Sequence, residues 1–153
     1  MLLCAGRLLT DKLNYKMETL TYQKETKAIK EHSCNFCAEK IKVGETYTKS
    51  THKCDGEVYD WKTHLHCANI AERLKMYDAA RDSGYEGVTD EFFMETIHCE
   101  HDDLMINLLP QNELQKYSDI IQQLRKVRFK DKFGYVIRHY AKLDKEAETK
   151  PCA

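Results

Sequence analysis

The sequence predicts an α+β fold in which a β-hairpin is followed by several helices. Alternating apolar and polar residues on both sides of the turn signal Asp55-Gly56 indicate the hairpin. Apolar residues that recur every three or four positions further along the chain indicate the helices. A Cys-x2-Cys pair and a His-x2-Cys pair flank the hairpin on either side. These features together predict a small unit in which the hairpin is tied to the first helix through these side chains.

Size and composition predict one domain, or one small domain with a helical extension. The chain has 153 residues, of which 42% are apolar and 32% are charged. We expect a polar N-terminal arm over residues 1–30, with or without a helical stretch, and a compact module over 31–84. A helical region over 85–147 and a flexible tail over 148–153 follow. Met17 is an alternative to Met1 as the start of the chain.

Within the module, residues 32–37 are expected to form a tight loop. Residues 45–52 and 57–62 are the predicted strands, and Tyr59 and Trp61 share one face of the second strand. A helical stripe then begins near His64 and ends at the Arg-Asp-Ser-Gly sequence of residues 81–84. The stripe consists of Cys67, Ile70, Leu74 and Tyr77.

Three more helices are predicted in the helical region. Thr89 is a suitable N-cap, and the acidic residues Asp90 and Glu91 after it suit the first turn of a helix. A second helix is expected to follow Pro110, and residues 128–132 form either a turn before the third helix or a continuous helix with it. The three apolar stripes are Phe93, Ile97, Leu104 and Leu108; Tyr117, Ile120, Ile121, Leu124 and Val127; and Phe133, Val136, Ile137, Tyr140 and Leu143.

The two flanking pairs predict one tetrahedral zinc ion, held by Cys34, Cys37, His64 and Cys67. A Cys-x2-Cys turn directs two thiolates to one point. His64 and Cys67 lie three residues apart on the first turn of a helix and therefore face the same way. Four protein ligands leave no position for water, which is typical of a structural zinc site. His66 is the alternative to His64 as the histidine ligand.

Loop, hairpin and helix in this order are typical of a treble-clef zinc finger. Residues 34–67, with Cys-Asn-Phe-Cys, Asp-Gly, Trp61 and His-x2-Cys, resemble the poly(ADP-ribose) polymerase-type zinc finger. They are also similar to small treble-clef proteins that include short accessory proteins of phages and mobile elements. The resemblance implies a zinc-held fold with the four ligands named above. Fingers of the polymerase family bind broken DNA ends through basic and aromatic residues, whereas residues 31–80 here contain seven basic and eight acidic side chains.

The other cysteines and histidines suggest lesser sites. Seven cysteines, an odd number, favour free thiols in a reducing compartment, which predicts a cytoplasmic protein. His98 and His101 are either part of a second metal site or buried, hydrogen-bonded histidines. His52 and Cys54 are either a minor metal or redox site or exposed loop residues. The sequence contains no apolar run of membrane-spanning length, so we expect no membrane partner.

Charge is distributed unevenly along the chain. Residues 81–110 contain one basic and eight acidic side chains, and residues 111–153 contain ten basic and six acidic ones. The two regions can pack against each other, or the basic one can bind nucleic acid. In the second case phosphates would meet a basic segment interleaved with Phe129 and Phe133. Its cations are Arg125, Lys126, Arg128, Lys130 and Lys132.

No catalytic nucleophile motif, phosphate-binding glycine loop or dinucleotide fingerprint is present in the sequence. We therefore expect a non-enzymatic, zinc-stabilised interaction module with a protein partner. Nucleic-acid binding through residues 125–133 is the alternative. A metal-dependent nuclease, which can also be built on a treble clef, is the second alternative.

Overall fold

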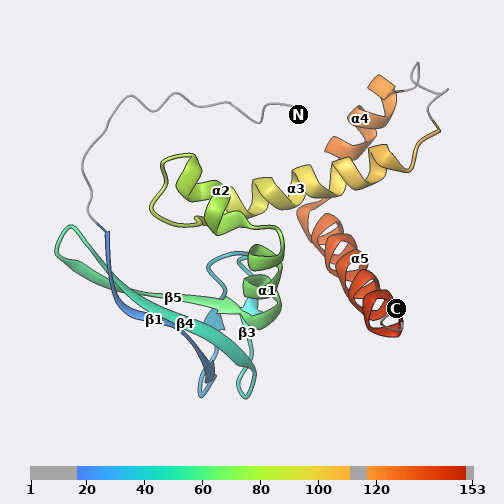
Figure 1. Cartoon of the computed structure of the whole chain (residues 1–153). Helices are drawn as coiled ribbons and strands as arrows, with labels where there is room; N and C mark the ends of the chain where they lie inside the picture. Colours follow the sequence, from blue (N-terminus) through green and yellow to red (C-terminus); the bar gives the residue numbers. More distant parts are fainter. Residues whose placement is uncertain (1–16, 111–116, 151–153) are drawn as a thin grey trace.

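The structure, a computed structural model, describes residues 17–110 and 117–150 and confirms the α+β class (Figure 1). Its strands form a three-stranded antiparallel sheet in the order β1-β4-β5 and a separate β2-β3 pair. Residues 1–16 and 151–153, which include most of the predicted arm and the end of the predicted tail, lie outside the described residues. The elements are β1 (Met17–Lys27), β2 (His32–Ser33), β3 (Lys40–Ile41), β4 (Thr46–Cys54), β5 (Glu57–His64), α1 (Leu65–Arg73), α2 (Met76–Asp82), α3 (Asp90–Asn107), α4 (Tyr117–Arg125) and α5 (Phe129–Thr149).

The predicted hairpin is confirmed as β4 and β5. Asp55 and Gly56 have φ values of 53° and 85°, and two consecutive positive φ values are typical of the tight turn that suits the twist of paired strands. Pairing runs from Cys54 opposite Glu57 at the turn to Tyr47 opposite His64 at the far end. The hairpin thus carries His64 to the end of the sheet where α1 begins.

The structure differs from the predicted polar arm, because residues 17–27 form strand β1 along the outer side of β4. The described side chains of this strand are almost all exposed, so its sequence lacks the apolar alternation that marks a half-buried strand. The register places Thr21 opposite Thr51 and Lys24 opposite Lys49. Two residues of β1 between these pairs therefore face a single residue of β4, which is a β-bulge.

One cluster of buried side chains joins residues 31–84, the predicted module, to the helices that follow. The ring of Phe36, between the two cysteines of the Cys-x2-Cys loop, stacks on Phe93 of α3 with centroids 4.6 Å apart. Phe93 in turn meets Phe133 of α5 edge to face, at 5.7 Å. Ile41, Met76, Ile97 and Val136 complete the centre of this core and have no exposed surface. Residues 31–84 and 85–147 thus share one hydrophobic core.

The predicted helix after His64 is divided in two. Residue Lys75 has φ 53°, a left-handed conformation that ends α1 and turns the chain before α2. The change of direction brings Met76 and Ala80 into the core, where neither has exposed surface. Burial of these two side chains offsets the cost of a left-handed lysine.

The predicted N-cap of α3 is confirmed. The Thr89 hydroxyl accepts a hydrogen bond of 3.1 Å from the backbone N–H of Phe92. Asp90 and Glu91 lie in the first turn, where their charges oppose the positive end of the helix dipole. Phe93 and Ile97 of the predicted stripe are fully buried.

Replacing Thr89 with alanine is expected to lower the free energy of unfolding by about 1 kcal/mol, because the Phe92 N–H loses its capping acceptor. Urea denaturation followed by circular dichroism measures the change. Thr96→Ala is the matched control: the Thr96 hydroxyl donates to the Phe92 carbonyl inside the helix and caps nothing. An equal loss in both variants would contradict the capping role.

The C-terminal helices begin and end at other residues than the pattern indicates. The break between α4 and α5 lies at residues 126–128, and Phe129 already begins α5. The predicted last helix is confirmed but continues to Thr149, into the segment expected to be a flexible tail. α5 packs along α3. In the described parts of the chain, no helix is long and apolar enough to cross a membrane.

Candidate metal centre

Cys34 and Cys37 lie in a tight turn between β2 and β3. The Cys34 N–H donates to the Glu39 carbonyl at 2.9 Å, and the Ala38 N–H donates to the Cys34 carbonyl at 3.0 Å. Asn35 ties the turn to β5: its side-chain oxygen accepts from the Lys62 N–H at 2.8 Å, and its own N–H donates to the Lys62 carbonyl at 2.7 Å. The turn is therefore held next to the last residues of β5.

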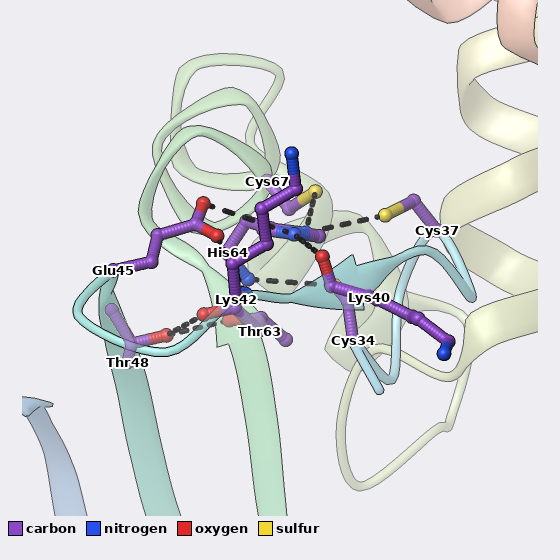
Figure 2. Close-up of polar contacts among 9 residues, drawn as sticks. All are labelled: Cys34, Cys37, Lys40, Lys42, Glu45, Thr48, Thr63, His64 and Cys67. Atoms are coloured by element: carbon purple, nitrogen blue, oxygen red, sulfur yellow. Dashed lines mark hydrogen bonds and ion pairs between the residues drawn. The ribbon is translucent and has the colours of Figure 1, made fainter. Parts of the chain in front are cut away.

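His64 and Cys67 lie where β5 meets α1. His64 is the last residue of the strand and the N-cap of the helix, and Cys67 lies three residues further, in the first turn. Both side chains are buried, at 5% and 0% exposure. The junction directs them toward the turn that carries the other two cysteines (Figure 2).

The four donor atoms can hold one metal ion. All lie within 4.8 Å of one another, and all four residues are buried. The His64 Nδ1 atom is 3.4 Å from the sulfur of Cys37 and 3.8 Å from that of Cys67. Tetrahedral zinc with bonds of about 2.3 Å to sulfur and about 2.0 Å to nitrogen spaces its ligand atoms about 3.5–3.8 Å apart. The donor set and its spacing fit such an ion.

A backbone carbonyl orients the ring of His64. The Nε2 atom lies 3.1 Å from the Lys40 carbonyl oxygen, to which it can only donate, so Nδ1 is left as the free lone pair toward the sulfurs. The Glu45 carboxylate lies 3.9 Å from the same Nε2. His66, the alternative ligand, is exposed and stacks on the His64 ring at 4.8 Å, outside the donor group.

When no metal is bound, hydrogen bonds among the three cysteines determine which sulfur is ionised and which ones keep their protons. Hydrogen bonds from the Cys37 and Cys67 thiols lower the pKa of Cys34, which becomes the thiolate of the group. The hydrogen bonds with Cys34 and Cys37, together with burial, raise the pKa of Cys67 far above its usual range. The hydrogen bond to Cys34 likewise raises the pKa of Cys37 to about 11. A divalent cation supplies the positive charge that allows all three sulfurs to ionise.

The backbone supports the anionic sulfurs as well. The N–H of His64 donates to the Cys34 sulfur at 3.4 Å. Sequence reasoning missed this contact and the roles of Asn35 and Lys40. The Lys40 and His64 contributions come from main-chain atoms, which leave no residue-type signal. Asn35 could have been noticed as a side chain suited to hydrogen bonding in a turn.

The other predicted metal residues do not gather. Among residues 17–110 and 117–150, the cluster above is the one group of three or more suitable donors. His101 is buried and its Nδ1 lies 2.9 Å from Asp102, while His98 meets the edge of Phe129. The ring nitrogens of His52 contact the hydroxyls of Ser50 and Thr19 at 2.8 and 3.3 Å. These histidines are hydrogen-bonded or packed.

The basic segment is only partly available to a partner. Arg125 and Lys126 are exposed, whereas Lys132 is 2% exposed. The other two cations of the segment lie near acidic side chains: Arg128 is 3.0 Å from Asp131, and Lys130 is 3.7 Å from Glu39.

Lys132 and the two phenylalanines of the segment belong to the interior. The Lys132 ammonium donates to Asp102 of α3 at 2.7 Å. Phe129 and Phe133 pack against the core. Packing of the basic region on the acidic helix, one of the two options above, therefore applies to these three residues.

The comparisons give no relative for this arrangement: no family model, no curated protein and no solved structure matches the chain.

Replacing Cys54 with serine is expected to leave metal stoichiometry at one ion per chain. Cys54 ends β4 at the hairpin turn and is not among the four clustered donors. Metal analysis of the purified variant by plasma mass spectrometry checks this result. A fall to zero would show that Cys54 holds the ion.

Proposed function

We propose that the chain is a non-enzymatic interaction module whose fold is held by one structural zinc ion, with a protein as its partner. The observation that carries the proposal is the closed donor set: four buried protein side chains from the β2-β3 turn and the β5-α1 junction, with spacings that suit a tetrahedral ion. Three thiols and one imidazole are the donor chemistry that zinc prefers in structural sites. In this proposal the β2-β3 turn, the β4-β5 hairpin and α1 together form a treble clef.

Zinc, when bound, supplies the charge that lets three thiolates lie close together and joins the turn to the helix. The protein's own residues do the remaining work. Lys40 and Asn35 set the positions of His64 and the turn, and the N–H of His64 reduces the charge on Cys34. These contacts support a site built for stability, since four protein ligands leave no coordination position for a substrate.

Two exposed aliphatic side chains beside the module support a protein partner. Ile29 and Val43 are 90% and 67% exposed. Their loops lie together because the Ala28 N–H donates to the Glu45 carbonyl and the Gly44 N–H donates to the Ala28 carbonyl. Exposed apolar side chains on two neighbouring loops offer a surface for contact with another protein.

The test of protein binding is affinity capture from the native host with a double variant, Ile29→Ser with Val43→Ser. Val58→Ser is the matched control, because Val58 is 60% exposed at the hairpin, away from these loops. We expect the double variant to lose a captured protein that the wild type and the control retain. Equal capture by all three would remove this surface from the proposal.

Nucleic-acid binding is the second candidate, and the sheet gives it a better basis than residues 125–133. Lys24, Lys49 and Lys62 lie side by side across β1, β4 and β5. Burial lowers the pKa of His32, and the positive charges of Lys62, Lys30 and Lys49 lower it further. Like charges on neighbouring strands repel each other unless anions such as phosphates neutralise them. One of the three lysines already has such a partner, because Asp60 pairs with Lys49 at 3.0 Å.

Gel-shift titrations of DNA and RNA at two salt concentrations separate the candidates. A complex whose affinity falls steeply with salt, and which weakens in Lys24→Gln with Lys62→Gln, would support phosphate binding at the sheet. The absence of any shift at low salt would exclude it. Incubation with plasmid DNA and magnesium or manganese is expected to give no nicking. Nicking that survives purification and is lost in a site variant would favour the nuclease alternative.

A further inference from the structure

A cavity of about 460 Å³ lies on one face of the three-stranded sheet and is also lined by Tyr77 of α2 and by residues 85–89, which lead into α3. This volume is in the range of small-molecule sites. None of the four metal donors lines it. Aromatic side chains dominate its wall: Tyr22, Phe36, Tyr59, Trp61, Tyr77 and Tyr85.

Strand alternation keeps basic side chains off this face. Thr48, Ser50 and His52 of β4 line the cavity, whereas Lys49 and Lys53 alternate with them and point to the opposite face. Among the described residues, no lysine or arginine lines the cavity, and the Glu86 carboxylate is its one acidic group. The described lining therefore holds no cation that would neutralise an anionic ligand, whereas Glu86 brings negative charge to it.

The β-bulge in β1 adds a ring to the mouth of the cavity. Because two residues of β1 face one residue of β4, Tyr22 and its neighbour Gln23 both reach the cavity. Tyr22 of β1 is 83% exposed, and Tyr77 of α2 and Tyr85 in the segment before α3 are 41% and 48% exposed. Exposed rings around an opening can close over a ligand by cation–π contact.

The polar groups of the floor already satisfy one another. The hydroxyls of Thr48 and Thr63 are 2.5 Å apart, and the Ser50 hydroxyl lies 2.8 Å from His52 Nε2. Burial lowers the pKa of His52, which favours its neutral form. These polar side chains at the base of the cavity therefore need no hydrogen bond from a ligand. They carry no positive charge that would repel a cationic ligand. At the edge of the cavity Thr89 is occupied by capping α3, and the acidic first turn offsets the dipole of that helix.

We propose that this cavity binds an organic cation of the quaternary or methylated ammonium class. Such a group has a positive charge that attracts ring faces and a carboxylate, and a quaternary one has no hydrogen-bond donor to satisfy. The aromatic wall, the single carboxylate and the internally bonded floor match these properties. The inference goes beyond the metal-held module, because it assigns a ligand to a site that the metal does not occupy.

Choline and its neutral isostere 3,3-dimethylbutan-1-ol are the probes, titrated into zinc-loaded protein at constant ionic strength. Trp61 is the single tryptophan of the chain and lines the cavity, so intrinsic fluorescence reports occupancy directly. We expect choline to give a saturable change and to bind roughly tenfold more tightly than the neutral isostere. Equal affinity of the two probes, or no saturable change with choline up to about 50 mM, would overturn the proposal.

Peptide arms of the same titration distinguish the source of the cation. A short peptide with one trimethyl-lysine is compared with the same peptide bearing norleucine, its uncharged counterpart. Tighter binding of the trimethyl-lysine peptide than of choline would support the proposal with a protein side chain as the ligand. Choline binding without peptide binding would support it with a free small molecule as the ligand.

Two variants test the charge and the rim. Glu86→Gln removes the carboxylate and keeps a polar side chain of the same shape, and Glu57→Gln is the matched control at the hairpin turn, outside the cavity. Tyr22→Leu removes an exposed ring without opening the core. Choline affinity is expected to fall about threefold or more in Glu86→Gln and in Tyr22→Leu and to stay unchanged in Glu57→Gln. Wild-type affinity in both cavity variants would overturn the assignment.

Discussion

Removal of the metal by a strong chelator is expected to unfold the protein, and Cys37→Ser is expected to have the same effect. Apparent binding free energies of structural zinc are about 10–16 kcal/mol in small zinc domains, which equals or exceeds the whole stability of a typical domain. Without the cation, Cys34 is the thiolate of the group, and the buried thiols of Cys37 and Cys67 must keep the protons that metal binding would release. The β2-β3 turn then loses its attachment to α1.

Unfolding should extend beyond the module, because Phe36 in that turn stacks on Phe93 of α3. Far-ultraviolet circular dichroism, with metal analysis of the same sample, measures the effect. Cys54→Ser is the control that leaves the donor group intact. A metal-free sample that keeps its melting temperature would refute the structural role of the ion.

The second large effect is expected from Asp102→Asn, with a loss of about 3 kcal/mol in the free energy of unfolding. Lys132 is 2% exposed, and its ammonium donates to the Asp102 carboxylate at 2.7 Å. The substitution leaves this buried positive charge without a negative partner. Urea denaturation measures the loss, and Asp103→Asn, at the exposed neighbouring position, is the matched control.

A compensating variant separates the charge from the shape of the site. In Asp102→Asn with Lys132→Met, no buried charge remains, so the double variant is expected to be more stable than Asp102→Asn alone. A double variant that is less stable than the single one would show that the buried charge is not the cause.

The pH dependence of stability follows from the same pair. Burial raises the pKa of Asp102, but hydrogen bonds from His101 and Lys132 and their charges outweigh burial and hold it below its usual value. A carboxylate with a depressed folded-state pKa contributes stability above its unfolded pKa of about 4, and this contribution is lost as the pH falls through the folded value. The free energy of unfolding of the wild type should therefore fall as the pH is lowered into the acid range. In Asp102→Asn it should depend less on pH in that range.

The sequence predicted those features that have short-range causes. The Asp55-Gly56 turn and the Thr89 N-cap depend on residues within a few positions of one another, and both are confirmed. The four clustered donors also follow from short spacings, since each pair lies within one turn and the hairpin joins the pairs. Metal occupancy and its identity stay predictions.

The features that were missed depend on distant partners. β1 is a strand because β4 offers it an edge, although almost all of its described side chains are exposed and no buried face marks it in the sequence. Lys132 is buried because Asp102 lies opposite it, thirty residues away in the chain, whereas its neighbours indicate an exposed basic segment. Lys75 adopts a left-handed conformation because the core accepts Met76, which no local pattern reveals.

Phe36 has a consequence for how the candidate metal centre and the proposed ligand cavity would be coupled. In the sequence it lies between the two cysteines of the turn. Its ring stacks on Phe93 of α3 and also forms part of the aromatic wall, where it meets Trp61 edge to face at 5.8 Å. Any occupant that favours the folded arrangement of this wall thereby favours the arrangement of the thiols, and the reverse holds by thermodynamic reciprocity. The concentration of the metal ion would then determine the fraction of the protein that can bind a ligand in the cavity.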